Sequence, residues 1–471
     1  MPNRKSPQPD STLTLPVRNL IKGTPIFVAS NATVSHAAHA MQSARVGSAL
    51  VATDPPGIVT DRDLRGRVLA QGLGPETPIT KIMTRPLKTI DSESPAFAAL
   101  RLMLEENIHH IPVIEEGKIV GVISSSDLLF HQATNPIYLR GVIDNLEKPA
   151  DLAHYAAEIA TLVQALFRAG LGAIQISQIV SSLNDALVKR LLALTLAKLG
   201  ATPTPYAWIV FGSEGRLEQT LLTDQDNALI YGEESETAHA YFAAVAREVV
   251  DGLIQAGFPP CAGGFMATNW CKPLAAWQEL FTQWTRLPKP DALLDAAIFF
   301  DFRAVAGTLS LQPLEEIIAA AKSQQLFLAH MARGALDFYP PLGFFNRLHS
   351  DHGKVDLKKG GIVPVVALAR VAALAAGSRE RSTLERLHVV PASGAFLSRE
   401  DATALGEIFP FLFHLRLQQQ LNSVATKRAI DHMVPLAELS NLARRHLKEA
   451  FVLIKGIQDA VRAAWQLDRL A

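Results

Sequence analysis

The sequence has little cysteine and no excess of charge of either sign. Two cysteines occur in 471 residues, Cys261 and Cys271, which is too few for a disulfide framework or a structural zinc site. We expect both to be buried free thiols. Lys plus Arg equals Asp plus Glu, 45 each, so the chain lacks the basic field that nucleic-acid-binding proteins carry. These absences predict a protein of the reducing cytoplasm that does not bind nucleic acid.

A signal peptide and a membrane-length apolar run are also missing. The segment Met1–Pro16 is rich in Pro, Ser and Thr and contains no apolar stretch, which predicts a disordered lead-in. The most apolar run, Gly361–Gly377, is short for a bilayer and carries Arg370 near its middle, so we expect a buried core helix and no membrane span. The length predicts about two to four domains.

Two segments between Val17 and Asn135 resemble each other and form an internal repeat. Each predicts a strand, an amphipathic helix, two further strands and a short helix. Each closes with Gly-apolar-apolar-Thr/Ser-x-x-Asp, first at Gly57–Asp63 and again at Gly121–Asp127. One such unit is too small to bury its own sheet face, so we expect the two to pair.

This repeat resembles a cystathionine-β-synthase (CBS) domain pair, an α/β regulatory module that usually binds adenosine nucleotides. The resemblance implies an AMP- or ATP-type nucleotide, with Thr60 and Ser124 near phosphate and Asp63 and Asp127 at ribose hydroxyls. A carboxylate can accept two hydrogen bonds from a cis-diol. These residues could instead be helix N-caps, and the two roles can coexist. CBS pairs commonly associate face to face, so the resemblance also implies a homodimer.

The motif that carries chemistry lies between two apolar, β-prone runs in the middle of the chain. Gly212-Ser213 follows the first run, and Asp224-x-Asp226 opens the second. Residues i and i+2 of a strand share a face, so the aspartates are expected side by side. Adjacent carboxylates need a cation or a proton between them, and such ligands suit Mg²⁺ shared with nucleotide phosphates. Gly212 permits close backbone approach, and Ser213 with the following amides can begin an anion-binding helix.

The string Gly-Ser-Glu-Gly-Arg-Leu-Glu-Gln-Thr…Thr-Asp-Gln-Asp-Asn-Ala resembles bacterial nucleotidyltransferases related to the protein-PII uridylyltransferases and glutamine-synthetase adenylyltransferases. The resemblance implies a polymerase-beta-type α/β core that transfers NMP from UTP or ATP to a hydroxyl. A protein such as a PII-like regulator is one candidate acceptor. Asp224 and Asp226 would hold Mg²⁺ or Mn²⁺ and act in catalysis with Ser213. The residues implied at the NTP phosphates are Gly212, Ser213 and Arg216.

One part of that family's pattern is missing. Related enzymes often place a third carboxylate on the next strand, but the segment Phe258–Asn269 contains none. Asp301, inside a very apolar run, is the best substitute, and a structural role beside Arg303 is the alternative. Arg216 could likewise pair with a neighbouring glutamate instead of phosphate. The missing carboxylate motivates a second hypothesis, a catalytically inactive nucleotide-sensing protein of signal transduction.

The C-terminal half predicts a helical bundle that resembles the substrate-binding domain following the core in related nucleotidyltransferases. The segment Asp356–Ile362 partly matches the Asp-Ile-Lys-x-Gly-x-Gly-Gly-Ile motif of glutamine-synthetase adenylyltransferases. Asp356 and Lys358 are therefore tentative site residues, because a lysine beside two glycines can meet phosphate; a solvated turn is the alternative. Arg416 and Gln418–Gln420 form a polar cluster on an apolar helix, lining either a cleft or the surface.

The predicted architecture is therefore multidomain, α/β followed by α, with a CBS-pair module, a nucleotidyltransferase core and a helical bundle. The predicted boundaries are a lead-in at 1–16, CBS repeats at 17–75 and 76–135, a helical connector at 136–200, the nucleotidyltransferase core at 201–305 and the substrate-binding domain at 306–471. We expect adenine-nucleotide binding at the CBS pair to regulate transfer.

Overall fold

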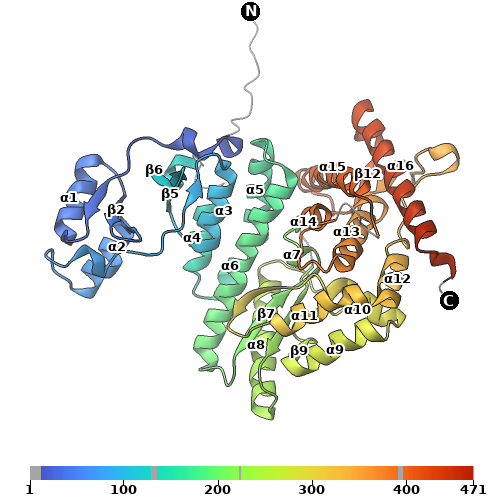
Figure 1. Cartoon of the computed structure of the whole chain (residues 1–471), viewed down its shortest axis with the longest axis horizontal. Coiled ribbons are helices and arrows are strands. Elements are labelled where there is room, and N and C mark those ends of the chain that lie inside the picture. Colours follow the sequence, from blue (N-terminus) through green and yellow to red (C-terminus); the bar gives the residue numbers. More distant parts are fainter. Residues whose placement is uncertain (1–11, 129–134, 222–223, 391–395, 470–471) are drawn as a thin grey trace, which may run out of the picture. The chain divides into compact units, whose positions relative to one another are not determined.

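A computed structural model of the chain describes residues 12–128, 135–221, 224–390 and 396–469 (Figure 1). Most of the predicted lead-in lies outside the described residues. The chain divides into two compact units. The N-terminal unit comprises Met1–Gly141 and Arg168–Leu171, and the C-terminal unit comprises Val142–Phe167 and Gly172–Ala471.

The N-terminal unit contains two three-stranded sheets of identical topology. In each, the first two strands are parallel and the last two antiparallel. The first sheet consists of β1 (Phe27–Ala29), β2 (Ser48–Ala52) and β3 (Gly57–Thr60); the second consists of β4 (Ile90–Asp91), β5 (His110–Glu115) and β6 (Lys118–Ser124). Helices α1 (Val34–Ala44) and α3 (Ala96–Glu106) occupy equivalent places. The predicted repeat is therefore confirmed.

The helices of both repeats are ended by the same local geometry. Arg45 after α1 and Asn107 after α3 adopt left-handed conformations, with φ of 55° and 52°. Thr33 caps α1 by accepting a hydrogen bond from the His36 backbone N–H at 3.2 Å. The apolar side of α1 is buried in the repeat's core through Val34, Ala37 and Met41. Amphipathic periodicity thus predicts these helices correctly.

The helices predicted as a connector are divided between the two units. They are α4 (Pro136–Asp144), α5 (Tyr155–Arg168) and α6 (Ala173–Leu199). Helix α6 packs against α8 (Glu236–Gln255), β10 (Arg303–Gly307) and α15 (Arg399–Ala425). Because α6 contacts elements on several sides, its leucines and isoleucines are buried around much of the helix. It is therefore part of the core of the C-terminal unit.

A four-stranded sheet forms the centre of the C-terminal unit, in the order β10-β7-β8-β9. The strands are β7 (Tyr206–Val210), β8 (Asn227–Tyr231), β9 (Cys271–Pro273) and β10 (Arg303–Gly307). Strand β7 pairs antiparallel with β8 and β10, and β8 pairs parallel with β9. Helices α8 and α9 (Leu274–Arg286) pack on β8 and β9. The apolar runs flanking the Gly-Ser and Asp-x-Asp motifs are therefore neighbouring central strands.

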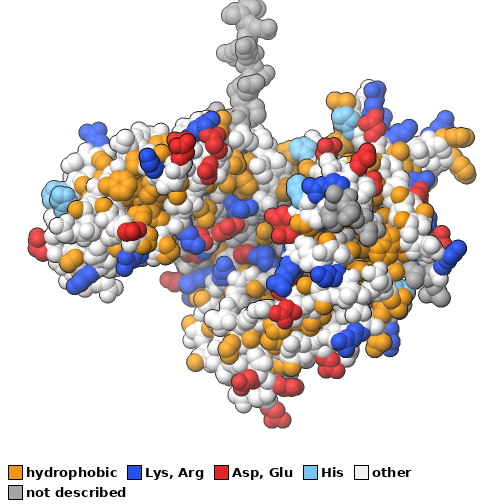
Figure 2. All heavy atoms as spheres, in the orientation of Figure 1, with side chains coloured by type: hydrophobic (Ala, Val, Ile, Leu, Met, Phe, Trp, Pro, Cys, Tyr) orange, Lys and Arg blue, Asp and Glu red, His pale blue; other side chains and the backbone are white. Residues whose placement is uncertain are grey.

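The rest of the C-terminal unit is mainly helical. Its elements are α10 (Pro290–Phe299), α11 (Gln312–Ala320), α12 (Gln325–Gly334), β11 (Lys354–Asp356), α13 (Val363–Ala375), α14 (Thr383–His388), α15 (Arg399–Ala425), β12 (Met433–Pro435) and α16 (Asn441–Ala464). The most apolar run of the sequence forms α13, which is buried, as expected. No helix of the described residues is both long and apolar enough to cross a bilayer. Acidic and basic side chains are interspersed on the face shown in Figure 2.

Candidate nucleotide and metal site

The Gly-Ser turn leaves β7 and packs against the second motif. Helix α7 (Gly212–Gly215) is a single short turn. Gly212 has a φ of 58°, and a Cβ atom there would lie 2.8 Å from Asp226 Oδ2. A Cβ at Gly215 would lie 1.9 Å from the Asp301 carbonyl oxygen. Both glycines are therefore required by neighbouring protein groups, and the close approach expected of Gly212 is to Asp226.

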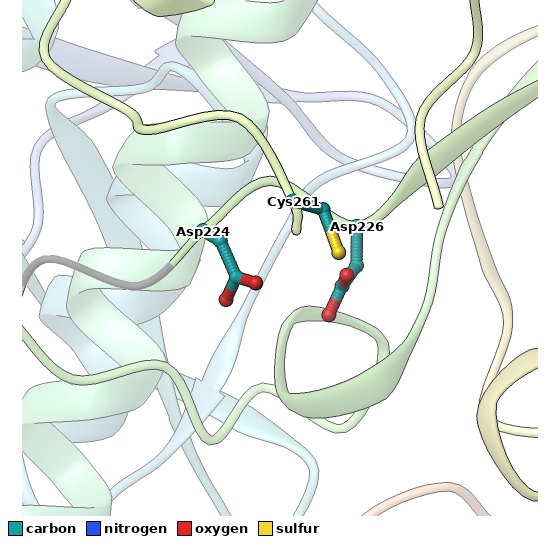
Figure 3. Close-up of side chains that lie close together, drawn as sticks. All are labelled: Asp224, Asp226 and Cys261. Carbon is teal, nitrogen blue, oxygen red and sulfur yellow. The ribbon is translucent and has the colours of Figure 1, made fainter. Parts of the chain in front are cut away.

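Asp224 and Asp226 precede β8, which begins at Asn227. The expectation that they open the strand is therefore wrong, by three positions for Asp224 and by one for Asp226. The Phe211 N–H still donates to the Asp226 carbonyl at 3.1 Å. One ligand atom each from Asp224, Asp226 and Cys261 lies within 4.8 Å of the others. Figure 3 shows the Cys261 sulfur beside the Asp226 carboxylate, with Asp224 directed to the same region. The three form the potential metal-ligand group found among the described residues.

The electrostatics of this group favour a bound cation. Burial and the Asp224 charge raise the pKa of Asp226 to about 7, although the Cys261 thiol, Lys358 and Arg216 act to lower it. A divalent cation removes the repulsion between the two carboxylates. The oxygen donors fit Mg²⁺ or Mn²⁺, and the thiol adds a softer donor.

Lys358 of the partly matched C-terminal motif lies close to these aspartates. Burial and Arg416 lower the pKa of Lys358, and Asp224, Asp226 and Asp356 partly offset this effect. Asp356, at the end of β11, accepts a hydrogen bond from the Lys359 backbone N–H at 2.9 Å through its side chain. Lys358 therefore lies within electrostatic range of the metal-ligand group.

Arg416 and His432 interact electrostatically with Lys358, and we call these three residues the basic cluster. Arg416 is 5% exposed, and burial with the Arg216 charge lowers its pKa to about 10. Burial, Arg416 and Lys358 lower the pKa of His432 to about 4. Arg416 Nε and His432 Nδ1 have no hydrogen-bond partner within the part of the chain that the structure describes. Arg416 Nε is a buried charged donor, and a donor of this kind suits an anionic ligand.

The glutamines around Arg416 are divided between interior and surface. Gln419 and Gln420 are buried, whereas Gln418 is exposed. Most of the polar cluster on α15 is therefore buried, which argues against the alternative that it lies on the ordinary surface.

Arg216 and Asp301 belong to a buried ion-pair network. Arg216 Nε donates to Glu218 Oε2 at 2.7 Å, and its Nη1 donates to Asp301 Oδ2 at 2.5 Å. Arg370 Nη2 and Arg386 Nη1 each donate to Asp301 at 2.6 Å. Burial alone would raise the pKa of Asp301, but the three arginines hold it well below its ordinary value.

Two sequence-based expectations change as a result. Asp301 is engaged by arginines and does not join Asp224 and Asp226 in the metal-ligand group. The structural role proposed as the alternative for Asp301 is realised, but not through Arg303. Arg303 instead pairs with Asp185 at 2.6 Å. The contacts of Arg216 favour its pairing with carboxylates over the phosphate contact predicted from the motif.

A second buried carboxyl lies under the Gly-Ser turn. Glu214 is 5% exposed, and burial with the nearby Asp185 charge raises its pKa to about 8. Asp226 adds to the effect and Arg303 opposes it. Burial therefore disfavours the charged form of this carboxyl. Sequence reasoning did not identify Glu214, Asp185 or His432 as site neighbours; the one available signal was that Asp185 is an acidic residue within an apolar helix.

The N-terminal unit places its four predicted nucleotide residues in matching arrangements. The Thr60 hydroxyl donates to Asp63 Oδ2 at 2.7 Å, and the Thr60 backbone N–H donates to the same oxygen at 2.9 Å. Ser124 repeats both contacts with Asp127, at 2.5 and 2.7 Å. Lys22 forms an ion pair with Asp127 at 2.7 Å. The capping alternative is therefore realised in the first repeat. The second carboxylate oxygen of Asp127 pairs with Lys22, and that of Asp63 pairs with Arg67 at 3.2 Å.

Family models match both parts of the chain. A CBS domain model matches residues 17–70 and 79–133. Models described as "Putative nucleotidyltransferase DUF294" and "Putative nucleotidyltransferase substrate binding domain" match residues 157–291 and 325–465. The chain thus combines a CBS domain pair with a nucleotidyltransferase-like core and its substrate-binding domain, in that order. The first of these two models begins within α5, so the family includes part of the predicted connector.

Individual relatives match mainly the CBS pair. The Arabidopsis thaliana CBS domain-containing protein CBSCBSPB2 is 32% identical over 139 residues, 27% of this chain and 26% of its own length. Bacillus subtilis YhcV, also a CBS domain-containing protein, is 30% identical over 110 residues, 23% of this chain and 79% of its own. A CBS domain protein of Pyrobaculum aerophilum, solved with AMP, is 31% identical and covers 25% of this chain and 94% of its own, with a TM-score of 0.23. The chain spans about a quarter of the length of CBSCBSPB2.

Proposed function

We propose that this protein transfers an NMP group from an NTP, UTP or ATP, to a hydroxyl. The observation that carries the proposal is the pair of carboxylates beside the Gly-Ser turn, with the basic cluster next to them. A site with two carboxylates that can hold a metal, together with the buried Arg416 and the exposed Lys358, matches the charge pattern of a metal–triphosphate complex. The nucleotidyltransferase family match to this part of the chain supports the same reaction class.

Each group has a defined task in this proposal. Asp224 and Asp226 hold Mg²⁺ or Mn²⁺, which when bound activates the attacking oxygen and neutralises phosphate charge. Ser213 and the Gly212 backbone lie at the phosphates, Lys358 and Arg416 offset their charge, and Asp356 adjoins Lys358. Arg216 and Asp301 position the Gly-Ser turn through their ion pair. The acceptor is a hydroxyl, with a protein such as a PII-like regulator as the leading candidate.

The CBS pair would regulate this reaction by binding an AMP- or ATP-type nucleotide. Thr60 and Ser124 would lie near phosphate, and Asp63 and Asp127 would accept hydrogen bonds from ribose hydroxyls.

We further propose a cytoplasmic homodimer assembled through the CBS pair. Light scattering that showed a monomer at micromolar concentration would contradict the dimer.

Transfer is tested by incubating the protein with labelled UTP or ATP, Mg²⁺ and a cell extract. Label is expected on a macromolecule, and it should be lost with Asp224→Asn plus Asp226→Asn, because each carboxylate is a metal ligand. The exposed carboxylate variant Asp351→Asn serves as the control and should retain transfer. Clear NTP binding without any transfer would support the rival function, a nucleotide sensor, which is favoured by the absence of a third carboxylate from the metal-ligand group.

Ligand binding at the CBS pair is tested with Thr60→Ala. This change should weaken AMP or ATP binding by at least about tenfold, because it removes one phosphate-side hydroxyl and that hydroxyl's contact with Asp63. The matched control is Thr33→Ala, which removes the cap of α1 in the same repeat at a similar stability cost of about 1 kcal/mol. Calorimetric titration measures both affinities. Equal losses in the two variants would show that Thr60 acts only as a helix cap.

A further inference from the structure

Cys261 occupies a position that the proposed reaction has not yet used. It lies in the loop after α8, and its Sγ shares the metal-ligand group with the two aspartate carboxylates. The loop is held there by backbone hydrogen bonds. The Gln225 N–H donates to the Pro259 carbonyl at 3.3 Å, and the Asn227 N–H donates to the Phe265 carbonyl at 3.1 Å. These contacts lie on both sides of Cys261, so the segment that carries the thiol is fixed to the segment that carries the aspartates.

We propose that Cys261 is the third protein ligand of the metal ion held by Asp224 and Asp226. The site would therefore accept thiophilic divalent cations, such as Co²⁺, Zn²⁺ and Cd²⁺, in preference to Mg²⁺. This inference rests on the metal site of the proposed function. It adds a ligand and a cation preference that the two carboxylates alone do not specify.

The donor set explains why a thiol can serve here. The segment Phe258–Asn269 carries no carboxylate, and Asp301 is occupied by three arginines. The Cys261 thiol is the remaining donor in the group. On binding, the thiol loses its proton to solvent and the sulfur lone pair forms the bond to the cation. Sulfur ligands select softer metals, whereas Mg²⁺ prefers all-oxygen coordination.

The adjacent basic cluster independently indicates a ligand at this place. Arg416 is 5% exposed, and its Nε has no partner among the residues described here. Lys358 interacts electrostatically with Arg416 and with both aspartates. A cation at the carboxylates together with an anion at the basic cluster would satisfy both halves of the site.

The presence of only two cysteines allows a direct spectroscopic test. In the full chain carrying Cys271→Ser, Cys261 is the sole thiol, and Co²⁺ is expected to produce a near-ultraviolet thiolate-to-cobalt charge-transfer band. The matched variant Cys261→Ser retains Cys271, which is buried, and should give no band. Asp224→Asn plus Asp226→Asn in the Cys271→Ser chain should also abolish it. No band in the Cys271→Ser chain, or an undiminished band in Cys261→Ser, would overturn the proposal.

Affinity provides a second readout that does not depend on turnover. Cys261→Ser should weaken Cd²⁺ or Zn²⁺ binding by at least about tenfold and leave Mg²⁺ binding nearly unchanged. Cys261→Asp should shift the preference toward Mg²⁺. Circular dichroism confirms that each variant is folded. Equal effects on Cd²⁺ and Mg²⁺ would contradict the ligand role, whereas NMP transfer that persists without a cobalt–sulfur band would leave the proposed function standing.

Discussion

Replacing Asp301 by asparagine is expected to destabilise the protein by about 3–5 kcal/mol, because it leaves buried arginines without their shared counter-charge. Arg216, Arg370 and Arg386 all donate to this carboxylate, which is 0% exposed. Losing it also removes a contact that holds the Gly-Ser turn, so NMP transfer should fall in parallel. The effect is large because the arginines remain buried while their attraction to the carboxylate disappears.

Thermal and urea unfolding of the full chain measure this effect at pH 6 and pH 8. The pKa of Asp301 is held below its ordinary value, so its contribution is complete above about pH 4 and is lost only in stronger acid. The two pH values should therefore give the same difference from wild type. The control is Glu315→Gln, whose partly exposed pair with Arg381 should contribute about 1 kcal/mol or less. A loss for Asp301→Asn no larger than for Glu315→Gln would contradict the network's importance.

Replacing Arg416 by methionine should have opposite effects on binding and on stability. NTP affinity should fall by about 10- to 100-fold, because a charge-assisted hydrogen bond contributes about 1.5–3 kcal/mol. Stability without ligand should be unchanged or higher, because burial disfavours this cation and methionine has a similar size. A purely structural arginine would instead lose stability and leave affinity intact.

Calorimetric titration with a non-hydrolysable NTP and Mg²⁺ measures the affinity, and thermal unfolding measures the stability. Arg445→Met is the control, because Arg445 is exposed on α16 and should change neither quantity. Unchanged NTP affinity in Arg416→Met would remove the basic cluster from the proposed nucleotide site. Destabilisation by several kcal/mol would show that the guanidinium mainly supports the fold.

Local sequence patterns were enough to predict the elements and the motif-bearing segments. The closing motif at Gly57–Asp63 recurs at Gly121–Asp127. Because the segments before the two motifs are also similar, the recurrence predicts two similar sheets. The apolar runs around Gly212 and Asp226 predicted two strands. The structure confirms these as β7 and β8 and shows in addition that they are paired. The exact start of β8 escaped prediction because a strand boundary depends on the neighbouring backbone as well as on residue type.

Long-range contacts could not be predicted in the same way. Arg216, Arg370 and Arg386 come together on Asp301 from separate parts of the chain, and only the packing of α13 and α14 against the core brings them there. Without these contacts, the sequence alone allows Asp301 to be interpreted as a metal ligand. The proximity of Cys261 to the aspartates depends on hydrogen bonds of its own loop, whereas its spacing from Cys271 suggested only a buried thiol.

The most direct test of nucleotidyl transfer compares two radioactive labels placed at different phosphates of one nucleotide. The protein and its acceptor fraction are incubated in parallel with UTP or ATP labelled at the α-phosphate or at the γ-phosphate, with Mg²⁺ and then with Mn²⁺. Nucleotidyl transfer predicts that the α-label alone becomes attached to the acceptor, that pyrophosphate carries the γ-label, and that Asp224→Asn plus Asp226→Asn abolishes both. Attachment of the γ-label would contradict nucleotidyl transfer. Transfer of the α-label that survives loss of both aspartates would contradict their role as metal ligands.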